Sequence, residues 1–329
     1  MGLQLSGGRR PDPSQHFLDG EAPDWRKCAV SGSRDQTLRV WDLERQVCLA
    51  MLRGHSGWVA CLSVDWQSLR AVSGAGDKTL RMWNLAENES LHIWQGHKDF
   101  VTCLAVDWAS GRVLSGSRDQ TLRLWGLGKI TPLATLSGHE DAVRCLAANW
   151  KKGRYISGSD DATLRLWTAA SSDRSGGSCS KVLQGHEAFV TCVAVEQNFR
   201  RAISGSGDNT LRLWDLDAGS CIGTLHGHTD SVRCLDVSWD MKRVLSGSGD
   251  GTLRMWELES LSCIRVFQGH EGHVSCVSAS WRSACALSGS RDRTLRLWNL
   301  DRGSCSGILR DHEHWIGCVQ VHDMLNFRA

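Results

Sequence analysis

The sequence has few prolines and almost no net charge. Only four of its 329 residues are proline, and three of those precede Asp24. Little therefore interrupts extended strands in the rest of the chain. The 38 basic and 36 acidic residues leave a formal charge of +2, and no long run carries one sign. With so little bulk charge, we expect neither a nucleic acid nor a charged membrane surface as partner.

Long hydrophobic runs and closely paired cysteines are also missing. No apolar stretch approaches the roughly 20 residues that a membrane helix needs, and the chain opens without a hydrophobic signal segment. Fourteen cysteines are present, but none forms a CxxC pair. In a chain of this length we expect reduced thiols, which favours a cytoplasmic or nuclear protein.

What the sequence does contain is one segment written many times. "SGSRDQTLRVW" at 31–41 returns at 115–125 with a single change. The shorter frame D-x-T-L-R-x-W occurs seven times, with tryptophans 42 residues apart except for one interval of 47. Repeats of this length indicate a stacked or circular architecture. The frame ends at Trp41, Trp83, Trp125, Trp167, Trp214, Trp256 and Trp298.

Each repeat reads as four short strands. Apolar stretches such as 101–108, 112–117, 121–125 and, in another copy, 221–227 are separated by Gly, Asp and Ser. Short β-type stretches between turn residues are typical of strands joined by tight turns. No segment shows a helical period.

These motifs resemble those of the WD-repeat β-propellers: Gly-His, then Ser-Gly-Ser-x-Asp, then Trp. The resemblance covers about residues 28–323 and implies an all-β, seven-bladed propeller of four-stranded antiparallel blades. In the last copy Asp311 replaces the glycine before the histidine, which puts the geometry of that turn in doubt. The pairs end at His55, His97, His139, His186, His228, His270 and His312.

The order of the motifs predicts how the ring closes. The chain begins with a Ser-Asp-Trp unit and ends with a Gly-His-like unit, so the two ends complement each other. We expect one blade to combine outer strands from about 26–53 with an innermost strand at 315–322. The predicted organisation is a disordered segment at 1–24, the propeller at 25–324 and a short tail at 325–329.

Each repeat also carries Ser, His and Asp, the residue types of a nucleophilic triad. A hydrolase built on Ser115, His97 and Asp119 is one hypothesis, but an active site is needed once and this set recurs in every blade. The resemblance implies instead a structural network that links Trp, Ser, His and Asp. The seven sets are His55, Ser73, Asp77, Trp83; His97, Ser115, Asp119, Trp125; His139, Ser157, Asp161, Trp167; His186, Ser204, Asp208, Trp214; His228, Ser246, Asp250, Trp256; His270, Ser288, Asp292, Trp298; and His312, Ser31, Asp35, Trp41.

Two further positions repeat and are therefore interpreted as scaffold. An arginine precedes each of the seven tryptophans by two residues, and a cysteine follows the first apolar residue of each innermost strand by two. The thiols are expected to behave as small buried hydrophobes. Equivalent thiols of different blades should not converge on one ion. We therefore expect no metal and no cofactor.

Specificity is sought where the copies differ on exposed turns. Two variable positions per blade fall at the end of the propeller that carries the Gly-His turns, which we call the top face. One precedes the innermost strand and the other precedes the tetrad Asp; a third lies between Val and Cys of the inner strand. Aromatic and arginine residues there are the types enriched at binding hot spots. The predicted partner-binding residues are Trp58, Phe100, Phe189, His273, Trp315, Arg34, Arg118, Arg144, Arg233 and Arg291.

From these features we predict a non-enzymatic scaffold that binds peptide segments of partner proteins on the top face. A second hypothesis is a phosphopeptide-reading substrate receptor, because the "VRC" and "SRD" segments are similar to those of F-box WD-repeat proteins; Asp160 in the same ring argues against it, and no F-box-like segment is seen. A third hypothesis is an adaptor subunit of a larger complex, such as a ubiquitin ligase, and a fourth is an enzyme that uses the central channel.

The first residues, "MGLQLS", match the pattern for myristoylation of Gly2. A membrane partner is expected only if Gly2 carries that acyl chain, and a single chain gives only marginal membrane binding.

Overall fold

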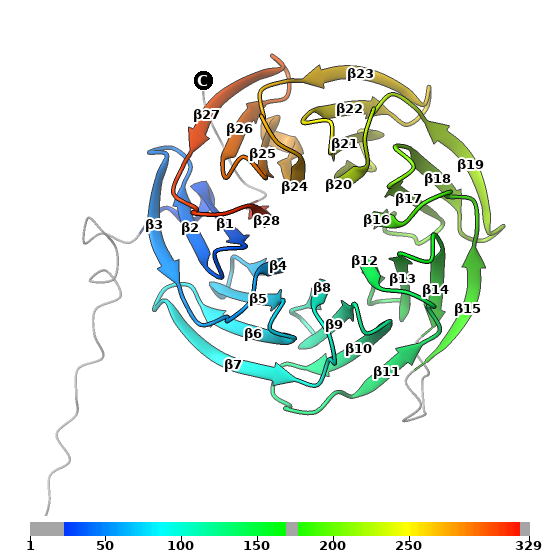
Figure 1. The fold of residues 1–329 in the computed structure, drawn as a ribbon, viewed down its shortest axis with the longest axis horizontal. Coiled ribbons are helices and arrows are strands. Elements are labelled where there is room, and N and C mark those ends of the chain that lie inside the picture. Colours follow the sequence, from blue (N-terminus) through cyan, green and yellow to red (C-terminus); the bar gives the residue numbers. More distant parts are fainter. Residues whose placement is uncertain (1–22, 169–176, 323–329) are drawn as a thin grey trace, which may run out of the picture.

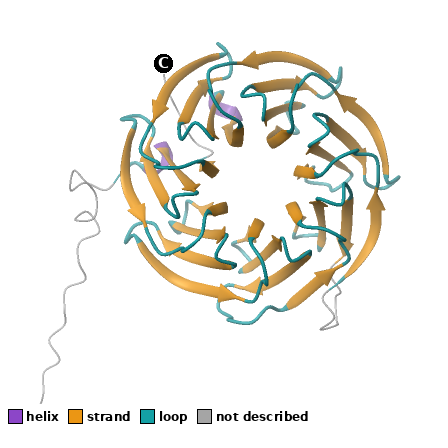
Figure 2. Ribbon diagram, viewed as in Figure 1, coloured by secondary structure: helices purple, strands orange, loops and turns teal. Residues whose placement is uncertain are grey.

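The computed structural model describes residues 23–168 and 177–322. In that part of the chain, seven four-stranded antiparallel sheets stand radially around a central opening (Figure 1). Figure 2 shows that strands dominate the ring; the helical elements of the described residues are two single-turn 3-10 helices, Trp25–Lys27 and Trp281–Ser283. The predicted all-β, seven-bladed propeller is confirmed. Gly2, the rest of segment 1–22, residues 169–176 of the inserted loop and the predicted tail lie outside the described residues.

Each blade runs from an innermost strand at the channel to an outermost strand at the perimeter. The innermost strands are β4 (Val59–Asp65), β8 (Val101–Asp107), β12 (Val143–Asn149), β16 (Val190–Val195), β20 (Val232–Ser238), β24 (Val274–Ser280) and β28 (Ile316–Val321). The second strands are β1 (Cys28–Ser33), β5 (Arg70–Ala75), β9 (Arg112–Ser117), β13 (Arg154–Ser159), β17 (Arg201–Ser206), β21 (Arg243–Ser248) and β25 (Cys285–Ser290).

The third strands are β2 (Leu38–Asp42), β6 (Thr79–Asn84), β10 (Thr121–Gly126), β14 (Leu164–Thr168), β18 (Leu211–Asp215), β22 (Leu253–Glu257) and β26 (Leu295–Asn299). The outermost strands are β3 (Val47–Leu52), β7 (Glu89–Gln95), β11 (Ala134–Ser137), β15 (Ser178–Leu183), β19 (Ser220–Leu225), β23 (Ser262–Phe267) and β27 (Ser304–Leu309).

Burial follows the position of a strand within its blade. In the second strands almost every residue is buried, because both faces of the sheet pack against neighbouring blades. In the outermost strands, exposed and covered residues alternate, as in β23 and β27. This alternation is that of a sheet edge with one face on the core and one in water.

Close packing between blades explains the glycine of the Ser-Gly-Ser segment. A Cβ at Gly74 would lie 2.5 Å from Cγ1 of Val101 in the next blade and 2.7 Å from Sγ of Cys61 in its own. Only a hydrogen atom fits there. The inner-strand cysteines thus fill the space beside these glycines as buried hydrophobes, and burial raises the pKa of Cys103 to about 12.

The two chain ends complete a single blade, as predicted. In Figure 1, β28, in red, lies beside β1, in blue. The two strands pair antiparallel, with Ala29 opposite Val321 and Val30 opposite Gln320. β28 also contacts the next blade, where the Val64 amide donates to Oε1 of Gln320 at 2.8 Å. Ring closure therefore covers the two blade faces that an open array would expose.

Candidate functional site

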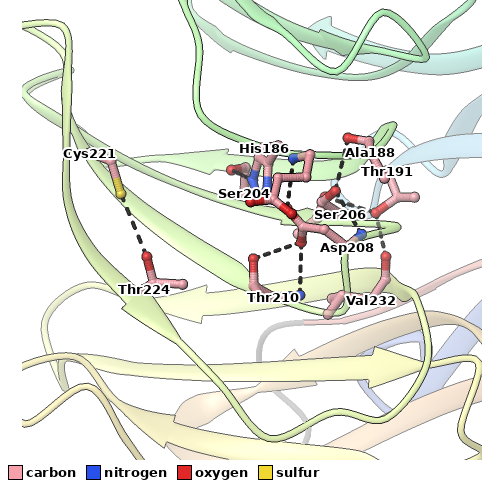
Figure 3. A network of polar contacts seen from close by, with 12 residues as sticks. His186, Ala188, Thr191, Ser204, Ser206, Asp208, Thr210, Cys221, Thr224 and Val232 are labelled. Atoms are coloured by element: carbon pink, nitrogen blue, oxygen red, sulfur yellow. Dashed lines mark hydrogen bonds and ion pairs between the residues drawn. The ribbon is translucent and has the colours of Figure 1, made fainter.

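The His-Ser-Asp sets form the predicted four-residue networks in all seven blades. In one blade, Trp214 Nε1 donates to Ser204 Oγ at 2.8 Å, and that oxygen lies 2.7 Å from His186 Nε2. Figure 3 shows Ser204, His186 and Asp208 of this network. Indole N–H is only a donor, so the serine proton points to Nε2 and the imidazole Nδ1–H donates to Asp208 at 2.7 Å.

The same geometry recurs without exception. Across the seven sets the Trp–Ser distances are 2.8–2.9 Å and the His–Asp distances 2.7–2.9 Å. All seven serines are fully buried. A serine that already bonds two partners and has no exposed surface has no route to a substrate. The arrangement is a brace in every blade, and the hydrolase hypothesis gains no support from it.

Burial and hydrogen bonds together set the charge of the tetrad side chains. Burial opposes ionisation of Asp208, but bonds from His186 and from Thr210 outweigh it and hold the pKa of the Asp208 carboxyl below its usual range. Burial also lowers the pKa of His97, His139 and His228, against the opposing influence of their aspartates. In these three networks a neutral imidazole beside an ionised carboxylate is the favoured state.

The seventh copy keeps this geometry although Asp311 stands where the other copies have glycine. Those glycines have φ near +155°, whereas Asp311 is not among the residues of positive φ. His312 still lies 2.7 Å from both Ser31 Oγ and Asp35 Oδ2. The doubt about this turn is resolved, because a different backbone angle places the same histidine.

The top face brings the two predicted variable positions of each blade together. The residue before the tetrad Asp donates its backbone N–H to the carbonyl of the residue before the inner strand. This bond joins Arg34 to Trp315 at 2.9 Å, Arg118 to Phe100 at 2.9 Å and Arg291 to His273 at 3.0 Å, and it is present in the other four blades as well.

Side chains from these positions line a hollow of about 400 Å³ at the mouth of the channel, which we call the rim hollow. His273 is the predicted partner-binding residue that does not line it. The rim residues that do are Trp58, Phe100, Phe189, Trp315, Arg34, Arg118, Arg144, Arg233 and Arg291.

Six rim side chains from four blades form a stacked ladder. The Arg34 guanidinium lies between two indoles, 3.9 Å from the Trp58 ring centre and 4.2 Å from that of Trp315. Arg291 stacks on Trp315 at 4.3 Å and thereby extends the ladder at one end. At the other end Arg118 lies 5.6 Å from Trp58 and 5.2 Å from Phe100. Cation–π contacts of this kind orient a guanidinium without neutralising it.

The opposite side of the rim hollow contains an ion pair. Arg144 on β12 donates to both oxygens of Asp160, at 2.7 and 2.6 Å. Bidentate pairing of this kind compensates the arginine charge. Asp160 is therefore bound within the ring, and it cancels one arginine out of the five that line the hollow.

Sequence reasoning missed several residues of the hollow. Thr102, Thr191 and Ser275 also line it, and each hydroxyl donates to a carbonyl of the next blade's inner strand. Figure 3 shows the Thr191 link to Val232. The signal was available, because these residues occupy the same inner-strand position as Arg144 and Arg233.

In residues 23–168 and 177–322 no three His, Cys, Asp or Glu side chains are grouped so as to hold a metal ion. The same part of the chain contains no helix that is both long and apolar enough to cross a membrane.

The repeats match those of a known protein family. The family model "WD domain, G-beta repeat" matches seven segments: 22–42, 46–84, 88–126, 130–168, 177–215, 219–257 and 261–299. Each full match contains the outermost strand of one blade and three strands of the next, so the repeats interlock neighbouring blades.

Two curated relatives share a shorter stretch with this chain. The WD repeat and SOCS box-containing protein 1 of Xenopus tropicalis and that of Danio rerio are each 54% identical to it over 41 residues. These residues are 12% of this chain and 10% of each relative, so the likeness spans about a tenth of the relatives' length.

Proposed function

Because the chain belongs to the WD40 family (WD domain, G-beta repeat), we propose that it is a protein-interaction scaffold that binds a peptide segment of a partner in the rim hollow. Protein-interaction scaffolds commonly contain WD40 propellers. The observation that carries the proposal is the concentration of aromatic and arginine side chains around one cavity of about 400 Å³. Trp, Tyr and Arg dominate the binding energy of protein interfaces when they cluster in a pocket.

Several features of the hollow suit a peptide segment. Its volume lies within the usual range for a site that encloses small groups. Phe189 is an exposed large hydrophobic residue, and it stands over Gly207, where a Cβ would meet its ring at 2.5 Å. The glycine thus makes room for an aromatic surface that faces outward.

The likeness to the two WD repeat and SOCS box-containing proteins is short. The 41 matched residues have almost the length of one 42-residue repeat, as expected of a likeness confined to a single repeat. A ligase-adaptor role has no observation of its own in the described residues.

The proposal is tested by affinity capture with the wild-type chain beside a Trp58→Ala, Phe100→Ala, Trp315→Ala triple variant. We expect the triple variant to recover the partners at least about tenfold less well, because hot-spot truncations each cost roughly 2 kcal/mol or more.

A matched control removes apolar side chains of the outermost strands instead, with Val47→Ala, Ile222→Ala and Ile264→Ala, three residues that are 41%, 51% and 43% exposed. This variant should recover partners like the wild type. Equal recovery by the wild type and the aromatic variant would place partner binding elsewhere on the protein.

A further inference from the structure

Positive charge in the rim hollow is concentrated and largely uncompensated. Five arginines line the cavity, and its described lining residues include no aspartate or glutamate. Arg144 is neutralised by Asp160. The remaining four, Arg34, Arg118, Arg233 and Arg291, form no ion pair with the described residues. Asp230 attracts the Arg233 charge without forming an ion pair with it, and its carboxylate accepts hydrogen bonds from the amide and hydroxyl of Ser231.

The arginines repel one another, so bringing them together costs electrostatic free energy. Burial lowers the pKa of the Arg34 guanidinium, and Arg291 and Arg118 lower it further. Burial also lowers the pKa of Arg233, and Arg291 adds to that effect. An anion placed among these groups would relieve the repulsion between the guanidinium charges.

The stacked ladder excludes the opposite kind of ligand. Aromatic rings around a pocket often receive a cation on their faces. Here the faces of Trp58 and Trp315 are already covered by guanidinium groups, among them that of Arg34. A stacked guanidinium keeps its N–H donors in its own plane, where they remain available to an anion.

We propose that the rim hollow anchors the bound peptide by an anionic side chain, a phosphate ester or adjacent carboxylates, and that Asp160 competes with this group for Arg144. This inference rests on the proposed function and specifies the chemistry of the same site. The anion is held by the four unpaired arginines. Asp160 lowers the affinity, because it occupies the donors of the fifth.

The test uses the full chain and four immobilised peptide libraries. The libraries share randomised flanks and differ at a fixed centre of phosphoserine, a Glu-Glu pair, serine or lysine. We expect retention on the phosphoserine or Glu-Glu library at least about tenfold above that on serine, the scale of one charge-assisted hydrogen bond. The better retained of the two identifies the source of the anion.

Point variants then assign the roles. Arg233→Gln and Arg291→Gln should each weaken retention on the anionic library about tenfold or more. Asp160→Asn should strengthen it by about threefold or more, because it frees Arg144. Adding Arg144→Gln to Asp160→Asn should cancel that gain. Arg282→Gln, at the exposed turn after β24, removes one charge away from the hollow and should leave retention unchanged. Thermal melting of every variant checks the fold.

Three results would overturn the inference. They are equal retention on the serine or lysine library, no response to Arg233→Gln and Arg291→Gln, and tighter binding of an oligothymidylate than of any peptide. Equal retention on serine with loss in the Trp58, Phe100, Trp315 variant would leave the proposed function intact while the anion chemistry fails. Unchanged retention in that aromatic variant would contradict the proposed function itself.

Discussion

The serine of each tetrad is the residue on which two other groups depend. Ser204 accepts the Trp214 N–H and bonds His186, and all three side chains are buried. Removing its hydroxyl leaves an indole N–H and an imidazole nitrogen without partners in a place that water does not reach. The cost of such orphaned groups, rather than the value of the bond itself, sets the effect of a substitution.

Ser204→Ala should therefore lower the free energy of unfolding by about 1–3 kcal/mol. Ser90→Ala, at an exposed position on β7, should change it by less than about 0.5 kcal/mol. Urea denaturation midpoints of the two variants and the wild type provide the comparison. Equal losses in both variants would show that the tetrad is not a brace.

Stability should fall in acid in two steps. The pKa values of His97, His139 and His228 are lowered in the folded state. Below about pH 6.5 these histidines therefore bind more protons in the unfolded chain than in the folded chain. The tetrad aspartates, with Asp250 lowered to about 2, add a second loss below about pH 4. In both cases the folded pKa is depressed, so the stabilisation is present above the unfolded pKa and is lost as the pH falls. Melting temperatures between pH 8 and pH 3 test this, and a constant or rising value from pH 7 to pH 5 would contradict it.

At the level of the strand, the close contact between neighbouring blades limits the size of the side chains that fit between them. The second strand of each blade places a glycine where its own inner-strand cysteine and a valine of the next blade's inner strand approach closely, as at Gly74; at Gly289 the valine is replaced by Ile316. The strands themselves were predictable from the alternation of apolar stretches and turn residues. The reason for this glycine was not, since it depends on how near the next blade comes.

Gly74→Ala should destabilise the protein by about 1–3 kcal/mol, because the new methyl group overlaps Val101 and Cys61. Gly128→Ala is the matched control, because nothing lies within 4 Å of a Cβ built there. It should be neutral or slightly stabilising. Thermal melting of both variants decides the matter, and similar melting temperatures would mean that the blades separate readily.

At the level of the whole molecule, one blade depends on residues from both chain ends. β28 supplies its innermost strand and His312 its tetrad histidine, whereas β1, β2 and β3 come from the other end. The seven blades form a closed circle only when these segments meet. Loss of the last strand should therefore affect the entire ring and not one blade alone.

Deleting residues from His312 onward should unfold or aggregate the protein out of proportion to the 18 residues removed. The point variant His312→Ala keeps β28 and should cost only about 1–3 kcal/mol, so it separates the tetrad from closure. Size-exclusion chromatography and thermal melting report the outcome. A truncated chain that remained monomeric and melted like the wild type would argue against closure.

The sequence by itself determined the number of blades, their four-strand pattern, the seven tetrads and the shared blade at the chain ends. These features repeat, and a period of 42 residues reports directly on a repeated structure. The same comparison indicated which rim positions vary, and nine of the ten residues chosen from them line one hollow.

Only the tertiary structure decided how those variable residues act on one another. Arg34 meets Trp58 and Trp315 because curvature of the ring brings three different parts of the chain to the channel mouth. Asp160 pairs with Arg144 across the hairpin of β12 and β13 and thereby compensates the charge of one of the five arginines that line the hollow. Distances between side chains of different blades depend on the closed ring as a whole, so no single repeat encodes them.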